Sequence, residues 1–341
     1  MREQFLQLHE YFMDVDRIPY AIAAILITMI AGVITGPFAG NANPFLWWII
    51  DKLVGGLGDR LNRAQRPKAD LMFRGFFITA LALFIALVLG KGFEFIAKAY
   101  PLYFASEAVL LALVLSSGSV WFALLRLYFA LEKKKVGTGA YYAIARSDRK
   151  NLSVGDDLSI TRCAMGYAAR IYDKGMIAPV LWYLIAGLPG AVIYSALAAL
   201  TWRFGKDGFS KGFAAIPYAL EKLMGIVPSL FSAGMLLAAS MFAPTAKLHK
   251  GLASLTGMKN RASYEQGGLP LSVLAWSLNL SLGGAFQDIS GSAIKGAWVG
   301  PEKATARNDH KHLRRALIIN LMAQLLFVVV LACAYLWGGG R

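Results

Sequence analysis

The sequence contains one pair of adjacent acidic residues, Asp156-Asp157. Two neighbouring carboxylates can hold a divalent cation such as Mg²⁺. The pair also follows a turn glycine, Gly155, and precedes an apolar-periodic run, where acidic side chains stabilise a helix start through the helix dipole. The pattern therefore favours a helix start over a metal site.

Other metal-ligating side chains are scattered. The cysteines, Cys163 and Cys333, are far apart in the chain, and neither lies in a metal-ligand spacing. His310 and His312 are two residues apart, which places them on different faces of a helix, and His9 and His249 are distant from both. We therefore expect no bound metal and no disulfide.

Two further features give no sign of phosphate-loop or transport chemistry. Gly283-Gly284 is not followed by the Lys-Ser/Thr of a phosphate-binding loop, so the sequence favours a tight loop or a close helix contact there. Glu94 and Glu107 lie at the ends of hydrophobic segments, and no acid lies in the middle of one. A transporter with a proton relay is therefore the weakest interpretation.

The composition is that of a membrane protein. Of the 341 residues, 57% are hydrophobic and 16% are charged, and the mean hydropathy is +0.51. This is too apolar for an ordinary soluble domain. The formal charge of +15 comes from basic residues that lie between hydrophobic segments and form no stripe with exposed aromatics. We therefore expect membrane lipid, and no nucleic acid, as a partner.

Six segments have the length and hydrophobicity of a membrane-spanning helix. They are Ile18–Gly36, Gly75–Phe95, Tyr103–Leu131, Ile177–Phe204, Gly225–Ala243 and Ala316–Trp337. Two weaker segments, Phe45–Leu57 and Leu269–Phe286, are expected to be interfacial or re-entrant. The start of the chain lacks a basic region and a cleavage site, so we expect the first span to be retained. With no internal repeat or linker, residues 1–341 are expected to form one polytopic all-α membrane domain.

The fourth segment is interrupted by Gly187-Leu188-Pro189-Gly190. Proline removes a helix hydrogen-bond donor and glycine weakens a helix, so we expect a break at this point. In lipid the backbone groups freed by such a break must be satisfied by protein or water. A re-entrant segment here is one of the alternatives.

The distribution of charge between the segments predicts the orientation. Basic residues exceed acidic ones in Asp59–Arg74 (five to two), Glu132–Lys174 (nine to five), Lys247–Glu265 (four to one) and Asp288–Arg315 (six to three). These loops should be cytoplasmic in a bacterial inner membrane, and with six crossings both termini would lie outside, where the acid-leaning start (Glu3, Glu10, Asp14, Asp16) is compatible. The loop Arg203–Lys222 is also basic, but six straight crossings would place it outside. It can be cytoplasmic only if the fourth segment is re-entrant and returns the chain to the side from which it entered.

Three motifs resemble those of the CobD/CbiB family, the adenosylcobinamide-phosphate synthases of cobalamin biosynthesis, and the more distant AmpE-like proteins. They are Gly175-Met-Ile-Ala-Pro179 with Trp182, Gly187, Pro189-Gly-Ala191 and Tyr194; Leu282-Gly-Gly284; and Ala297-Trp-Val-Gly300. Weaker likenesses lie at Gly36-Pro37, Asn43-Pro44 and Ala145–Asp148. The resemblance runs from about Ile30 to the end of the chain. It implies a reaction that joins an aminopropanol, usually as its phosphate, to a corrinoid carboxylate as an amide, with ATP and Mg²⁺.

The chain departs from the family at the acidic positions. The family's Ala-Glu-Asn-x-x-Asp-Gly is replaced by residues 169–175, in which Arg170, Ile171 and Lys174 stand for Glu, Asn and Asp. The family's Asn-Thr-x-Asp-Ser motif is likewise altered at residues 198–202, and its Asp-Asp-x-x-Asn motif is altered at residues 221–225. Exchanging a carboxylate for a cation reverses the local charge and would repel Mg²⁺.

Two interpretations of these cations remain open. A basic pocket could bind an anion such as a phosphate, a corrinoid carboxylate or a lipid head group; its candidate residues are Arg146, Arg162, Arg170 and Lys174. Alternatively, Arg162, Arg170 and Lys174 are positive-inside anchors at the membrane surface.

We therefore expect a divergent CobD/CbiB-like membrane protein without synthase activity. It would act as a binding, regulatory or scaffold subunit, with a corrinoid or other anionic ligand and a membrane-protein partner as candidates and with no cofactor. The alternative is an active synthase with a rebuilt site that uses ATP and Mg²⁺. The acids available to it are Asp148, Asp156, Asp157, Asp173 and Glu221.

Overall fold

The computed structural model describes residues 14–63, 65–100, 105–206, 208, 212–257 and 259–339. The expectations that involve Glu3, His9, Glu10, Tyr103 and Lys211 lie outside these ranges.

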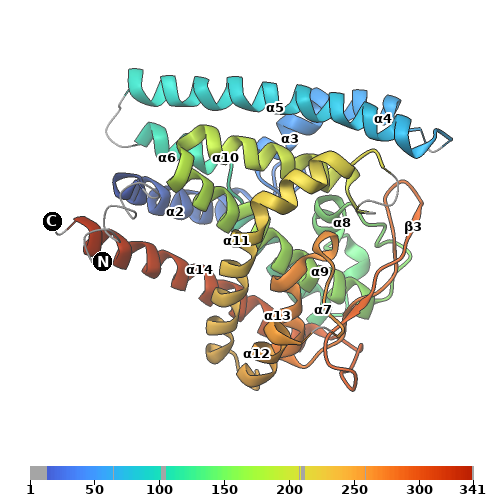
Figure 1. Ribbon diagram of the computed structural model, residues 1–341. Coiled ribbons are helices and arrows are strands. Elements are labelled where there is room, and N and C mark those ends of the chain that lie inside the picture. Colours follow the sequence, from blue (N-terminus) through green and yellow to red (C-terminus); the bar gives the residue numbers. More distant parts are fainter. Residues whose placement is uncertain are drawn as a thin grey trace.

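The described chain is almost entirely helical, as predicted (Figure 1). The longer helices are α2 (Ile18–Thr35), α5 (Lys68–Ala99), α7 (Gly118–Glu132), α9 (Asp157–Tyr172), α10 (Ala178–Phe204), α11 (Ala215–Ala239), α13 (Gly268–Leu278) and α14 (His310–Gly339). The shorter ones are η1 (Val15–Arg17), α3 (Phe45–Ile50), η2 (Asp51–Gly55), α4 (Gly56–Leu61), α6 (Ala105–Ala112), η3 (Val136–Thr138), α8 (Tyr142–Asp148), η4 (Asp173–Ile177), η5 (Ser240–Phe242), α12 (Leu248–Thr256) and η6 (Tyr264–Gln266).

Between α13 and α14 the chain forms two small antiparallel strand pairs. Strand β1 (Leu282–Gly283) pairs with β4 (Trp298–Val299), and β2 (Phe286–Gln287) pairs with β3 (Ala293–Ile294). The two pairs form a ladder that ends in a hairpin at residues 288–292. We call residues 282–299 the flap.

Five helical stretches of the described chain are long and apolar enough to cross a membrane. They are Val15–Thr35, Lys68–Ala99, Asp157–Phe204, Ala215–Phe242 and His310–Gly338. The third predicted span, Tyr103–Leu131, is divided at residues 113–117 between α6 and α7. The Ser116-Ser117-Gly118 sequence explains the division, because serine hydroxyls compete for hydrogen bonds with the helix backbone. Here Ser117 Oγ donates to Gln324 Oε1 at 2.7 Å instead.

The fourth predicted segment breaks where expected and reverses direction. Ala186 and Gly187 have non-helical backbone angles, with φ of +66° at Gly187. Lys174 Nζ lies 3.0 Å from Glu221 Oε1, and Tyr194 Oη lies 3.3 Å from the same oxygen. In one straight helix residues 174 and 194 would be about 30 Å apart. Residues 157–186 and 188–204 are therefore two antiparallel arms, which we call the hairpin.

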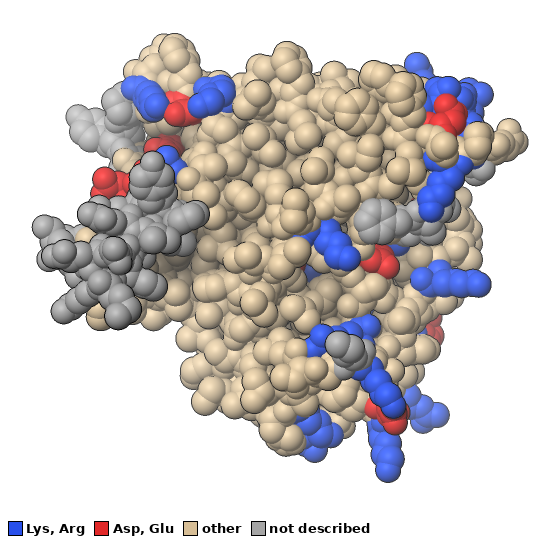
Figure 2. Space-filling model, in the orientation of Figure 1, with Lys and Arg blue, Asp and Glu red and all other residues tan. Residues whose placement is uncertain are grey.

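The hairpin defines two ends of the molecule. At the Gly187 end, Arg17 NH1 donates to the last carbonyls of the first arm, Tyr183 O and Leu184 O, at 3.4 Å. At the other end, which we call the α8 end, Arg203 on the second arm pairs with Asp51 at 3.3 Å and Asp59 at 2.5 Å. Figure 2 shows an uncharged band between charged groups at the two ends, as expected for a chain that crosses a membrane.

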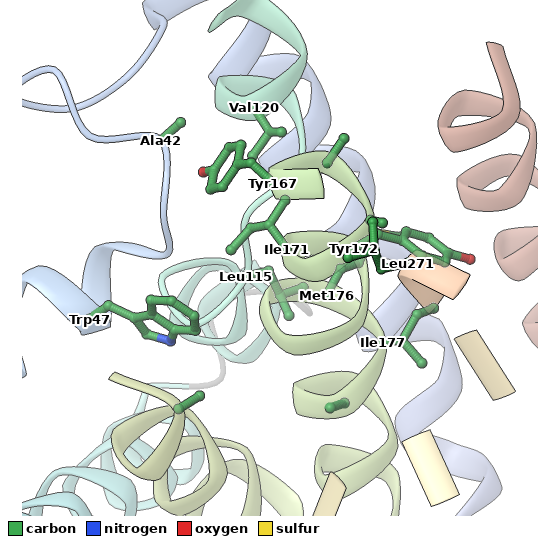
Figure 3. Packing of buried hydrophobic residues seen from close by; sticks show 14 of the residues in the cluster. Ala42, Trp47, Leu115, Val120, Tyr167, Ile171, Tyr172, Met176, Ile177 and Leu271 are labelled. Carbon is green, nitrogen blue, oxygen red and sulfur yellow. The ribbon is translucent and has the colours of Figure 1, made fainter. Parts of the chain in front are cut away.

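The predicted connection Glu132–Lys174 is not a surface loop. Its second half is α9 and the start of η4, and the core packs around them. Figure 3 shows Tyr167, Ile171 and Tyr172 from this stretch, with Met176 just after it and Trp47 nearby. All five are at most 3% exposed. The turn η4 is π-helical, a local form that often occurs at functional sites.

Candidate functional site

The three regions in which the acidic motifs of the resembling family are altered lie together. Arg170 and Lys174 on the first arm and Ala198 and Thr201 on the second arm line one narrow cavity. Glu221, on α11, contacts Lys174 directly. The hairpin produces this arrangement, because it returns residues 198–202 to the level of residues 170–174.

Lys174 is buried and paired. Its ammonium lies 3.0 Å from Glu221 Oε1 and 4.0 Å from the ring centroid of Tyr264. The side chain of Lys174 is 8% exposed and that of Glu221 is 0% exposed. Tyr264 donates to Glu221 Oε1 at 2.7 Å. The interpretation of Lys174 as a surface anchor was therefore wrong, because a carboxylate from α11 draws it into the bundle.

Arg170 is also part of an internal ion pair. Its guanidinium contacts Asp148, whose side chain is 0% exposed, and Lys150 Nζ lies 2.7 Å from the second oxygen of the same carboxylate. Arg170 is 17% exposed and lines a cavity, so it is no surface anchor either. Asp148 thus joins α8 to the first arm through two cations.

Asp173 is a buried carboxyl beside the Lys174–Glu221 pair. It is 3% exposed and accepts a hydrogen bond of 2.7 Å from Ser232 Oγ on α11. Its neighbour Lys174 turns toward Glu221. Three of the five acids that the sequence offered, Asp148, Asp173 and Glu221, are therefore in this region.

A second cavity, which we call the basic cavity, lies between α9, the segment 148–155 and the flap, and has a volume of about 230 Å³. Its lining is rich in cations. They are Lys150, Arg162, Arg170, Lys206 and Lys295. The lining also contains two acids: Asp148 pairs with Lys150 and Arg170, and Glu265 accepts a hydrogen bond of 2.7 Å from Tyr218. Five cations against two carboxylates leave the lining with a net positive charge, which suits an anion.

The narrow cavity of about 30 Å³ adjoins the basic cavity and shares three lining residues with it, Arg170, Lys206 and Glu265. Trp47, Trp202 and Tyr218 supply its aromatic surface. A ligand in the basic cavity would therefore lie beside the altered motifs.

Lys206 was missed as a site residue because the sequence shows it as one cation of a connecting loop. Its ammonium contacts Asp288 Oδ1 on the flap and donates to Arg149 O. Burial lowers the pKa of Lys206 to about 7, although Asp288 opposes that shift. Burial alone would raise the pKa of Asp288, but the hydrogen bond and charge of Lys206 lower it to about 2. Lys206 thus fastens the flap to the second arm.

Two aromatic contacts line the flap side of the cavity. Lys150 Nζ lies 4.4 Å from the ring centroid of Phe286, and the Arg162 guanidinium lies 5.0 Å from that of Trp298. Gly283 and Gly284 also line the cavity. A Cβ on Gly283 would lie 2.5 Å from Ala297 O, so the pair serves a close contact, as predicted.

The remaining predicted residues lie elsewhere. Arg146 donates to Ala39 O at 2.6 Å and borders an adjoining surface hollow, which shares Lys150, Asn151 and Leu152 with the basic cavity, but Arg146 does not line the basic cavity itself. Asp156 caps α9 by accepting from Ser159 N at 2.9 Å, and this hydrogen bond lowers the pKa of Asp156. Asp157 is exposed in the first turn of α9. The prediction of a helix start at this pair is confirmed.

The residues present do not fit a bound Mg²⁺. Among the described residues there is no group of three Asp, Glu, His or Cys side chains that could hold a metal ion. At the centre of the site, cations occupy two of the places where the resembling family has acids, and they are paired with Asp148 and Glu221.

Comparison with known proteins gives one consistent result. Residues 25–320 match the model of the CobD/Cbib protein family. The Cobalamin biosynthesis protein CobD of Sinorhizobium sp is 27% identical over 244 residues, which are 68% of this chain and 73% of that protein. That of Rhizobium meliloti (strain 1021) is 26% identical over 186 residues, 51% of this chain and 55% of that protein.

A Probable cobalamin biosynthesis protein CobD of Pyrococcus abyssi (strain GE5 / Orsay) is 25% identical over 216 residues, 60% of this chain and 66% of that protein. The chain thus spans between about half and three quarters of the length of these relatives. No solved structure matches significantly.

Proposed function

This chain belongs to the CobD/Cbib family, and on that premise we propose that it serves cobalamin biosynthesis as a multi-pass inner-membrane protein that binds an anionic ligand and does not form the corrinoid amide. The observation that carries the proposal is the pair of buried ion pairs, Arg170–Asp148 and Lys174–Glu221. Each acid of these pairs is already neutralised by a cation of the chain, so neither is available to hold Mg²⁺.

The ligand enters the basic cavity through its anionic part. Five cations line a space of about 230 Å³, which is smaller than the roughly 300–1,000 Å³ of a typical pocket for a drug-sized ligand. A corrinoid would therefore place a peripheral carboxylate or phosphate chain there and leave its ring outside. A free phosphate ester would fit whole.

Binding should depend on the cavity cations. We expect Lys295→Gln, and more strongly Lys295→Gln with Arg162→Gln, to weaken binding of inorganic phosphate and of a corrinoid with free carboxylates by tenfold or more. A charged hydrogen bond lost from such a site costs about 1.5–3 kcal/mol. Titration calorimetry of the detergent-purified protein measures the change. Arg146→Gln is the matched control, because it removes a charge of the same region outside the cavity. Equal weakening by Arg146→Gln would contradict the assignment.

The enzyme alternative has its own support, since Asp148, Asp173 and Glu221 are all buried beside the cavities. Complementation separates the two functions. A strain that lacks its authentic synthase and receives limiting corrinoid precursor should not grow with this protein. Robust growth would show that the chemistry persists, and Asp148→Asn, Asp173→Asn and Glu221→Gln would then identify the acid that carries it.

A further inference from the structure

The length and hydropathy of α11, taken alone, allow it to span a membrane. Whether α11 crosses from one end of the molecule to the other depends on the path of the chain before and after it. The described part of the chain starts and finishes at the Gly187 end: a Cβ on Gly338 would lie 3.0 Å from the side chain of Val15, which precedes Arg17.

The passes before α11 are fixed by contacts at both ends. Helix α2 leaves the Gly187 end, and α5 returns to it, since Gly75 abuts Phe213 and Gly90 abuts Pro189. Helices α6 and α7 lead back to the α8 end. Tyr183 donates to Glu107 at the start of that pass, at 2.7 Å, and the rings of Tyr128 and His310 lie 6.2 Å apart at its finish.

The hairpin then makes two passes, and α14 makes the last one, from His310 to Gly338. These are six passes in total: α2, α5, the α6–α7 pair, two arms and α14. An even number already returns the chain to its starting end. The segment from Ala215 to His310 must therefore begin and finish at the α8 end, which one crossing by α11 would prevent.

The shape of α11 agrees with this count. It contains Pro228, and in Figure 1 it bends so that its second half runs across the direction of α5 and α10. Its last turns lead to an elbow with α12. Lys247 N donates to Ser277 O at 2.7 Å, and Lys250 Nζ donates to Asn279 Oδ1 at 2.7 Å, so the elbow is held against α13.

The outer surface of this elbow is apolar. Met241, Phe242, Leu248 and Leu252 are 70%, 58%, 40% and 55% exposed. Leu248 and Leu252 are four residues apart and so share a face of α12. On the side of this helix that faces α13, Gly251 packs against Ser277. The elbow is thus an apolar surface on a fixed support.

The charge around the elbow has one sign. Lys247 and Lys259 are exposed, and no acidic residue occurs between positions 240 and 264. Amphipathic helices with lysines beside exposed leucines lie at the boundary of head groups and acyl chains, and anionic lipids strengthen their binding.

We propose that α11 does not span the bilayer and that the α11–α12 elbow lies in the leaflet at the α8 end, on anionic phospholipid. The exposed apolar side chains enter the acyl layer, and Lys247 and Lys259 meet the head groups. This proposal concerns the support of the site by the membrane and does not depend on the ligand of the cavity.

Cysteine labelling tests the sidedness. In a Cys163→Ser, Cys333→Ser background, Thr256→Cys, Arg307→Cys and Lys98→Cys are treated with a membrane-impermeant maleimide in intact and in broken cells. Arg307 lies at the α8 end and Lys98 at the Gly187 end. We expect Thr256→Cys to be labelled under the same condition as Arg307→Cys and opposite to Lys98→Cys. Labelling together with Lys98→Cys would show that α11 crosses.

Quenching tests the lipid contact in nanodiscs. A bimane label on Leu252→Cys should be quenched by brominated acyl chains, whereas a label on Ser153→Cys, in an exposed loop, should not be. Brominated phosphatidylglycerol should quench at least twice as strongly as brominated phosphatidylcholine. Lys247→Gln with Lys259→Gln should bring this ratio to about 1, while Lys133→Gln leaves it unchanged. Absence of quenching at Leu252→Cys, or a wild-type ratio of 1, would overturn the proposal.

Discussion

At the level of single residues, the Lys174–Glu221 pair is the most constrained charge interaction in the site. Removal of one partner leaves an uncompensated buried charge, which costs about 3–5 kcal/mol, whereas apolar residues of similar size in place of both are often neutral. We expect Glu221→Leu to lower the thermal unfolding midpoint of the purified protein strongly. Lys174→Met with Glu221→Leu should recover most of the loss. If the double variant is as unstable as the single one, the pair is not the reason for the loss.

Lys206 gives the protein a defined pH response. The pKa of Lys206 is about 7 in the folded chain, against about 10.4 for an unperturbed lysine. Between these values the unfolded chain binds more protons than the folded one, so stability rises with pH. We expect the unfolding midpoint to rise more between pH 7 and pH 10 in the wild type than in Lys206→Met. Equal slopes in the two proteins would contradict the lowered pKa of Lys206.

The same pair predicts an acid limit. The pKa of Asp288 is lowered to about 2, so its contribution to stability is present above about pH 4 and is lost as the pH falls toward 2. Asp288→Asn should abolish this part of the acid response and loosen the flap. Proteolysis of the exposed tip at Ser290–Gly291 is a direct measure of the loosening.

Sequence reasoning identified some of these residues and missed others for a physical reason. Arg170 and Lys174 were recognised because they stand at motif positions, and Arg162 as a neighbouring cation; all three line the cavities. Lys150, Lys206 and Lys295 were missed, since only tertiary folding brings the flap and the second arm to α9. Arg146, which was included from the weaker motif likeness at Ala145–Asp148, borders a neighbouring hollow and does not line the basic cavity.

At the level of elements, Gly187 determines the hairpin. Its φ of +66° and ψ of −163° are open to glycine but not to other residues, and an alanine Cβ would lie 3.5 Å from the Arg17 guanidinium. Backbone strain of this kind costs about 1–3 kcal/mol. We expect Gly187→Ala to lower the unfolding midpoint. Gly234→Ala is the control, because a Cβ on this α11 residue would meet nothing within 4 Å. The control should be neutral or slightly stabilising.

The sequence predicted the break at residues 187–190 and left open whether the chain reverses there, with a re-entrant segment as one alternative. Glycine and proline indicate that a helix is interrupted, yet the angle at the interruption depends on what packs on each side. Here Arg17 closes the first arm and Gly90 admits Pro189 at close range. For the same reason the predicted span 225–243 was assigned by hydropathy alone, which cannot separate a crossing helix from one that lies along the membrane.

At the level of the whole molecule, the hairpin removes the one inconsistency in the predicted topology. Residues 203–222, whose basic character conflicted with an outside location, follow the second arm and lie at the α8 end. The connections 59–74 and 288–315 also lie there, with basic residues in excess. The loop 91–107, which is balanced in charge, is at the Gly187 end. These three basic connections are thus on one side.

The orientation in the membrane follows from this distribution. Lysine and arginine in short loops are retained in the cytoplasm, so we expect the α8 end, with the basic cavity and the flap, to face the cytoplasm. Green fluorescent protein inserted after Ser153 should be fluorescent. Alkaline phosphatase fused after Tyr100 should be active, since that position is at the Gly187 end. An active phosphatase at Ser153 and an inactive one at Tyr100 would reverse the orientation.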